Sequence, residues 1–143
     1  MVRRWVEQDP LAIWDSVQQA IELTLERAAE AVGEVTVVAV GITNQRETTV
    51  VWDRATGQPL HNAVVWLDNR TADLCHALSR ELGGGDFFRG VTGLPISTYF
   101  SAYKLRWLLT WCPEVAAAAQ DDRAMFGTVD SWLMYQLTGG AEV

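Results

Sequence analysis

The first third of the chain combines a helical apolar pattern with an uninterrupted apolar run. From position 14 to position 32, apolar residues recur at spacings of three and four, with polar residues between them. Asp9 followed by Pro10 is typical of a helix start, and Gly33 is typical of a helix end. The pattern therefore predicts an amphipathic helix from Pro10 to Gly33. The continuous apolar run 35–42 predicts a strand buried on both faces.

The rest of the pattern predicts short strands and then several helices. Strands are expected over 48–53 and 63–66, separated by a turn rich in Gly and Pro. A helix capped by Asp68 is expected to end at three glycines, 83–85. Further helical segments are expected over 86–91, 98–111, from 113, and 129–137 with Thr128 as its cap.

The segment 98–111 has apolar residues on two stripes and not on one. We therefore expect this helix to be buried over much of its surface. The first stripe is Ala102, Leu105, Leu109 and Cys112, and the second is Phe100, Tyr103, Trp107 and Trp111.

The order of elements predicts an α/β or α+β architecture with a short sheet and several helices. Only three strands are visible in the sequence, which is little sheet for so many helices. We expect further strands that belong before residue 1 and after residue 143. On this expectation, the edge of the run 35–42 is exposed, prone to pair with other chains and a source of poor solubility.

Composition places the chain among soluble globular proteins of one domain. Its 143 residues are 49% hydrophobic and 20% charged, which suffices for a core. The net charge is −7, and the 11 basic residues form no cluster beyond Arg3 and Arg4. Nucleic-acid binding needs a basic stripe against the phosphates, so it is excluded as the function.

The cysteines, histidines and apolar runs indicate no metal site, membrane span or secretory signal. Cys75 and Cys112 lack a CxxC spacing and are interpreted as reduced, buried thiols of a cytoplasmic protein. His61 and His76 lack metal-ligand spacing. No run is long enough for a membrane span, and the N-terminal sequence does not resemble a secretory signal.

Two opposite charges, Arg46 and Glu47, lie between the expected strands 35–42 and 48–53. Arginine offers only donors and glutamate only acceptors, whereas a hydroxyl is both. The pair could therefore satisfy neighbouring hydroxyls of a polyol. The plainer alternative is a hairpin loop with two solvated charges. Likewise Trp66 and Tyr99 could pack against the carbon atoms of a polyol or simply belong to the core.

Three long segments carry a family resemblance. They are GITNQRETTVVWDRATGQPLHNAVVWLDNRT (41–71), TGLPISTYFSAYKLRWLL (92–109) and FGTVDSWLMYQLTGG (126–140). These segments closely resemble the glycerol kinases of the FGGY carbohydrate-kinase family. The resemblance runs from about Trp5 to Gly140, nearly the whole chain.

The resemblance implies a ribonuclease-H-like, actin-like ATPase fold and phosphoryl transfer from ATP to glycerol with Mg²⁺. The residues that match the glycerol-binding set of that family are Arg46, Glu47, Trp66 and Tyr99. Arg46 and Glu47 would hold the glycerol hydroxyls, Trp66 would pack against its carbons, and Tyr99 would add a hydrogen bond. The resemblance also leaves open a homo-oligomer of the full-length parent.

Several family elements have no match in residues 1–143. They are the first phosphate-binding hairpin, the aspartate that acts as general base, a glutamine on glycerol, and the C-terminal nucleotide domain. Trp111 also stands where the family has a polar or charged residue. We therefore expect a partial glycerol-binding N-terminal domain that holds no catalytic, cofactor or metal residue and is inactive alone.

Two alternatives remain at this point. The chain could be a non-catalytic glycerol-binding or interaction module. Otherwise its parent could be a kinase for another polyol or sugar.

Overall fold

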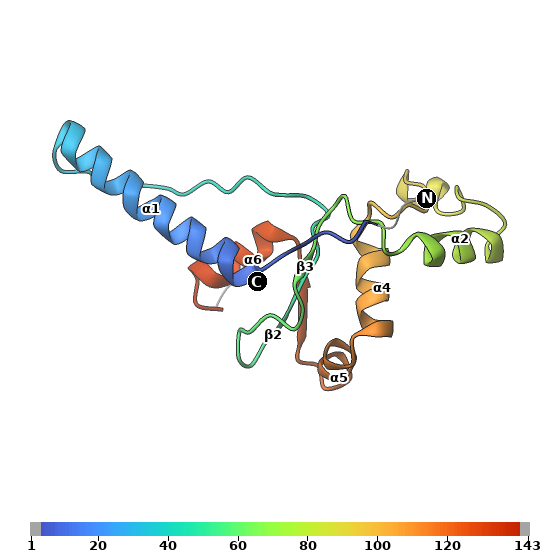
Figure 1. Cartoon of the computed structure of the whole chain (residues 1–143). Coiled ribbons are helices and arrows are strands. Elements are labelled where there is room, and N and C mark those ends of the chain that lie inside the picture. The colour runs from blue at the N-terminus through green and yellow to red at the C-terminus, as the bar shows by residue number, and fades with distance from the viewer. Residues whose placement is uncertain (1–3, 141–143) are drawn as a thin grey trace.

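The computed structural model describes residues 4–140, in which helices surround a narrow antiparallel sheet (Figure 1). Its strands are β1 (Glu7–Gln8), β2 (Val50–Asp53), β3 (Ala63–Val64) and β4 (Ala124–Gly127). Its helices are α1 (Pro10–Val32), α2 (Ala72–Glu81), α3 (Arg89–Thr92), α4 (Ser101–Trp111), α5 (Pro113–Gln120) and α6 (Val129–Leu137). The α/β class and the expected short sheet with several helices are confirmed.

The sheet is made of two antiparallel pairs joined by a bridge. β1 pairs with β3, and β2 pairs with β4 so that Val50 faces Gly127 and Asp53 faces Ala124. An antiparallel bridge between Thr49 and Val64 connects the two pairs. Residues that are far apart in sequence thus meet at the start of β2.

The two faces of β2 support two separate hydrophobic clusters, because successive side chains of a strand point to opposite faces. Val50 and Trp52 pack with residues of α6 and the first turns of α1, and Trp132 donates from its indole N–H to the carbonyl of Pro10, 2.9 Å away. On the other face, Val51 packs with Leu108 of α4 and with residues of α5. The sheet is therefore a layer between two groups of helices.

Helix α1 begins and ends as the sequence predicts. Asp9 accepts a hydrogen bond from the backbone N–H of Leu11 at 2.9 Å, and Gly33 closes the helix with a φ of +87°. Beyond its first turns the helix projects from the body of the molecule, and the chain returns alongside it (Figure 1). Pro10 is the only residue of α1 that is fully buried.

The predicted buried strand 35–42 is wrong. These residues form no strand, and all of them are exposed, with Val38 93% exposed. A strand needs the backbone of a neighbour for its hydrogen bonds, and this run has none among residues 4–140. The apolar run therefore stays extended and open to solvent.

The predicted burial of helix 98–111 is also wrong in detail. The observed helix α4 starts at Ser101, and its fully buried residues are Lys104 and Leu108, which neither predicted stripe contains. Trp111 is 66% exposed and Leu109 39%. The face of α4 that packs on the sheet follows the i, i+4 spacing of Lys104 and Leu108.

Smaller differences concern strands and thiols. β1 and β4 were not predicted, and β3 ends at Val64, two residues earlier than expected. Both cysteines are free, but only Cys75 is buried, since Cys112 lies half-buried between α4 and α5.

Candidate functional site

Arg46 and Glu47 occupy the centre of a tight turn that leads into β2. The backbone N–H of Thr48 donates to the carbonyl of Gln45 at 3.3 Å. Glu47 has a φ of +63°, a left-handed conformation that costs a residue with a side chain roughly 1–2 kcal/mol. A type II turn requires this conformation at its third position, where glycine is usual. A charged residue is thus kept at a position that the backbone disfavours.

The two amides before this turn fix it to the rest of the fold. Gln45 donates from Nε2 to Oε1 of Gln8 at 2.9 Å and to the hydroxyl of Thr48 at 2.8 Å. Asn44 donates to the hydroxyl of Thr128 at 2.9 Å and accepts from the backbone N–H of Asp130 at 3.1 Å. Asn44 and Gln45 therefore tie the turn to the start of α6 and to β1.

The carboxylate of Glu47 is fixed by the first residue of α4. Its Oε2 atom accepts from both the backbone N–H and the hydroxyl of Ser101, each at 2.7 Å. Glu47 thereby binds one of the free N–H groups at the start of α4. Its other oxygen, Oε1, has no hydrogen bond to any residue in the described range 4–140. One oxygen anchors the carboxylate, and the other can accept from a ligand.

Trp66 and Tyr99 lie against each other, and Tyr99 is two positions before Ser101, which anchors this carboxylate. Their ring centroids are 6.2 Å apart in an edge-to-face arrangement. The backbone N–H of Trp66 donates to the hydroxyl of Thr48 at 3.2 Å, which ties Trp66 to the turn of Glu47. Trp66 is 43% exposed, so its surface is partly open to a ligand. The Tyr99 hydroxyl makes no hydrogen bond within residues 4–140.

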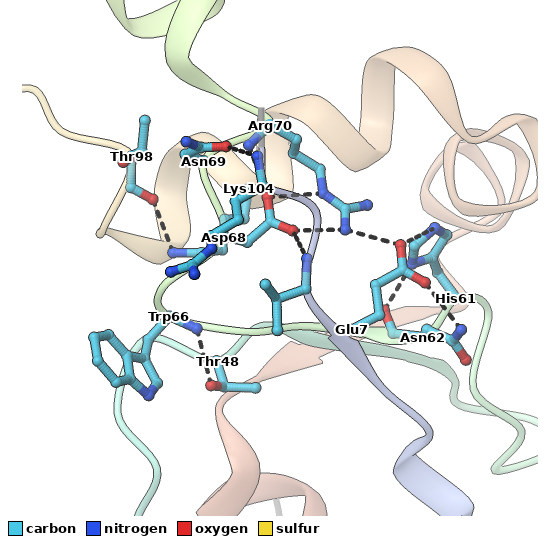
Figure 2. A network of polar contacts seen from close by, with 12 residues as sticks. Glu7, Thr48, His61, Asn62, Trp66, Asp68, Asn69, Arg70, Thr98 and Lys104 are labelled. Atoms are coloured by element: carbon cyan, nitrogen blue, oxygen red, sulfur yellow. Dashed lines mark hydrogen bonds and ion pairs between the residues drawn. The ribbon is translucent and has the colours of Figure 1, made fainter. Parts of the chain in front are cut away.

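Lys104 lies underneath these side chains and is fully buried. Its Nζ donates to the carbonyl of Thr98 at 3.0 Å (Figure 2) and also to the carbonyl of Tyr99. Burial lowers its pKa to about 8, against the attraction of the Glu47 and Asp68 carboxylates. A buried lysine therefore binds the backbone next to the candidate site, and the sequence analysis did not identify it.

Arg46, unlike the other three predicted residues, lies in an open part of the surface without a bonding partner within residues 4–140. It is exposed, and its side chain makes no hydrogen bond or ion pair with residues 4–140, Glu47 included. The structure thus brings Glu47, Trp66 and Tyr99 together around Lys104 and Ser101. It places Arg46 on the same turn with its donors open to solvent.

An ion-pair network lies beside Lys104, with Asp68 and Arg70 buried and Glu7 at its exposed end (Figure 2). Asp68 accepts from Nε and Nη2 of Arg70 at 3.0 and 2.8 Å, and from the backbone N–H of Val6 at 2.6 Å. Arg70 also pairs with Glu7 at 2.8 Å, and its guanidinium lies over the rings of Trp5 and Trp107, which contact each other. Burial raises the pKa of Glu7, but hydrogen bonds from Asn62 and Arg70 outweigh burial and lower it below the usual value.

A cavity of about 490 Å³ adjoins Glu47 and Ser101. Its walls come mainly from the first turn of α4 and the segment 88–95, which contains α3, with Phe88, Leu94, Pro95 and Phe100 among them. Trp66 and Tyr99 are not among its lining residues. This cavity is therefore mostly apolar and adjacent to the polar cluster, not identical with it.

Ser101 and Lys104 are the site residues that sequence reasoning missed. A signal for Lys104 was present, because it is the only lysine of the chain and lies four positions before a buried leucine on an apolar helix. Ser101 gave no such signal, since its contact with Glu47 spans 54 positions.

Metal and membrane features are lacking in the part of the chain that the structure describes. No group of three or more His, Cys, Asp or Glu residues between positions 4 and 140 could hold a metal ion. None of the helices seen over that range is long and apolar enough to cross a membrane.

Comparison with known proteins shows which family this chain resembles. The model of the N-terminal domain of the FGGY family of carbohydrate kinases matches residues 2–143. A glycerol kinase of Methylorubrum extorquens is 52% identical over 138 residues, and one of Methylorubrum populi is 51% identical over the same length. These 138 residues are 96% of this chain but only 27% of each relative, so the chain spans about a quarter of their length.

Solved structures agree with this match. The crystal structure of Plasmodium falciparum glycerol kinase with ADP superposes with a TM-score of 0.79 at 35% identity, over 95% of this chain and 27% of that one. A xyloylose kinase from Brucella ovis shares the fold, with a TM-score of 0.70 at 22% identity over 92% of this chain and 25% of that one. The chain therefore belongs to the FGGY family of carbohydrate kinases and matches their N-terminal domain.

Proposed function

We propose that this chain is the glycerol-recognising part of a glycerol kinase. In that assignment the parent enzyme transfers the γ-phosphoryl group of ATP to glycerol with Mg²⁺ in the cytoplasm. Residues 1–143 would then form part of the N-terminal domain. The similarity to glycerol kinases at about 50% identity supports this proposal more than the 22% identity to the xyloylose kinase supports a sugar substrate.

The observation that carries the proposal is the anchored carboxylate of Glu47. Because Ser101 holds Oε2, the free Oε1 can accept from a ligand hydroxyl without a large loss of side-chain entropy. The unpaired guanidinium of Arg46 on the same turn can donate to a second hydroxyl. Hydrogen bonds to charged groups contribute roughly 1.5–3 kcal/mol each, which suits a small polar ligand.

Trp66 and Tyr99 supply the remaining contacts of the proposed site. The half-open indole can pack against the carbon atoms of glycerol, and the Tyr99 hydroxyl can add a hydrogen bond. A ligand that lacks one hydroxyl would lose one of these charge-assisted hydrogen bonds, so it should bind more weakly than glycerol.

Nucleotide and metal are not assigned to residues of this chain. The described residues contain no cluster of acidic side chains that would suit Mg²⁺. We therefore expect the 143-residue chain by itself to bind glycerol without catalysing phosphoryl transfer. Glycerol-dependent ADP release by the isolated chain would contradict this expectation.

Isothermal titration calorimetry of the chain with glycerol tests the proposal. We expect binding that Arg46→Ala and Glu47→Gln each weaken at least tenfold, and weaker binding of propane-1,2-diol. Arg27→Ala is the matched control, because Arg27 is an exposed arginine on the projecting helix α1. Equal affinity of glycerol and the diol, or an equal loss in Arg27→Ala, would refute the assignment.

A further inference from the structure

We propose that Lys104 is a positioning residue of the glycerol site, which holds the backbone at 98–99 and so sets where Tyr99 meets Trp66 and where the start of α4 meets Glu47. This inference rests on the function proposed above. Lys104 is fully buried and does not line the cavity beside Glu47, so it is not expected to touch the ligand.

The hydrogen bonds of Lys104 are the first support. Both acceptors, the carbonyls of Thr98 and Tyr99, lie in the non-helical segment just before α4. The side chain of a helical residue leans toward the helix N-terminus, so Lys104 is well placed to reach back over this segment. A segment without a backbone ladder is thereby fixed at two consecutive carbonyls.

The position of these carbonyls is the second support. Tyr99 carries the ring that meets Trp66, and Ser101, two residues later, carries both donors to Glu47. The same short segment therefore supplies one aromatic wall and the anchor of the carboxylate. Loss of the two Lys104 bonds would loosen both contacts together.

The cost of burying a cation is the third support. A charge taken out of water is unfavourable unless it is paired and hydrogen-bonded, whereas a methionine would pack at this position without that cost. The groups whose charges act on Lys104 are the carboxylates of Glu47 and Asp68 and the thiol of Cys75, and the Tyr99 ring lies 6.0 Å from Nζ. The cation is thus placed among groups that surround the proposed site.

The first test needs no ligand. In Lys104→Met, we expect the exchange of the Ser101 amide to accelerate at least tenfold relative to the Val51 amide, and the NMR signals of the Tyr99 and Trp66 rings to shift. Leu108→Val is the control, because Leu108 is the other fully buried residue of α4 and lies one turn away. Unchanged Ser101 exchange in Lys104→Met, or the same changes in both variants, would overturn the inference.

The second test measures glycerol affinity by calorimetry in the same two variants. We expect Lys104→Met to bind about tenfold more weakly than the unmodified chain and Leu108→Val to bind equally well. Wild-type affinity in Lys104→Met would overturn the positioning role. Should the unmodified chain fail to bind glycerol, the proposed function fails, and the ligand-free spectra still decide the role of Lys104.

Discussion

The carboxylate of Glu47 and the first residue of α4, Ser101, are joined by two hydrogen bonds that converge on one oxygen. This contact links the turn before β2 to a helix 54 positions later and leaves the second carboxylate oxygen open. It places a charged acceptor at a fixed position on the turn before β2.

Removing the Ser101 hydroxyl should loosen this contact without abolishing it. In Ser101→Ala the backbone N–H still donates to Glu47, so we expect glycerol affinity to fall several-fold and unfolding free energy to fall by about 1 kcal/mol. Calorimetry and urea unfolding measure the two effects. Thr110→Ala removes a hydroxyl from the same helix, where it donates to the carbonyl of Arg106, and should leave affinity unchanged.

The left-handed conformation at Glu47 predicts that a glycine variant at this position is more stable than an alanine variant. Neither Glu47→Gly nor Glu47→Ala can anchor a ligand, but glycine adopts a φ of +63° without strain. We expect the glycine variant to be more stable than the alanine variant by about 1 kcal/mol. At the neighbouring position, Arg46→Gly should instead be less stable than Arg46→Ala, because Arg46 has no positive φ. Urea unfolding of the four variants tests this order.

The lowered pKa of Lys104 predicts that the stability of the chain depends on pH. Its pKa is about 8 in the folded chain, against 10.5 for an unperturbed lysine. Between these values the unfolded chain holds a proton that the folded chain has lost, so stability rises with pH, by at most roughly 1.4 kcal/mol per pH unit.

The matched comparison is Lys104→Met, which lacks this titration. Burial raises the pKa of Cys75 and of Tyr103, which lowers stability at high pH, but both groups are present in both proteins. Between about pH 8 and 10, urea unfolding should show the unmodified chain gaining stability relative to the variant. A constant difference across this range would contradict a lowered pKa at Lys104.

The buried pair of Asp68 and Arg70 predicts a large loss of stability. Asp68→Asn would leave the buried guanidinium without its main counter-charge, and we expect unfolding free energy to drop by about 3–5 kcal/mol. The control is Asp86→Asn, which breaks the exposed pair between Asp86 and Arg89 and should change stability little. Similar losses in both variants would show that burial of the Asp68 pair is unimportant.

The exposed run 35–42 predicts association between copies of the chain. An unpaired extended apolar segment offers backbone groups and side chains to a second strand. We expect Val38→Lys to reduce concentration-dependent association in sedimentation velocity. Val91→Lys alters an equally exposed valine, 91% against 93%, which lies in α3 and should leave association unchanged.

The sequence predicted the elements whose signals are local. Asp9, Pro10 and Gly33 mark the ends of α1 within a few residues of each end, and the structure agrees. Strand β4 gave no such signal, because it exists only through its pairing with β2. The strand predicted for 35–42 was wrong because an apolar pattern alone does not provide a neighbouring strand.

The candidate site shows the same division. Glu47, Trp66 and Tyr99 were chosen by their chemistry and by family resemblance, and the structure brings them near one another. The roles of Ser101 and Lys104 depend on how α4 lies against the turn before β2, which no local pattern encodes. Arg46 was predicted to act as a pair with Glu47, yet no hydrogen bond or ion pair joins the two side chains in the part of the chain that the structure describes.

Enclosure of Lys104 has a practical consequence for chemical labelling. It is the only lysine of the chain, and none of its surface is exposed. Amine-acylating reagents can therefore modify this side chain only when the segment before α4 opens. The acylation rate of Lys104, followed by mass spectrometry, would therefore report how often that segment opens. The rate should fall when a bound molecule holds the segment closed.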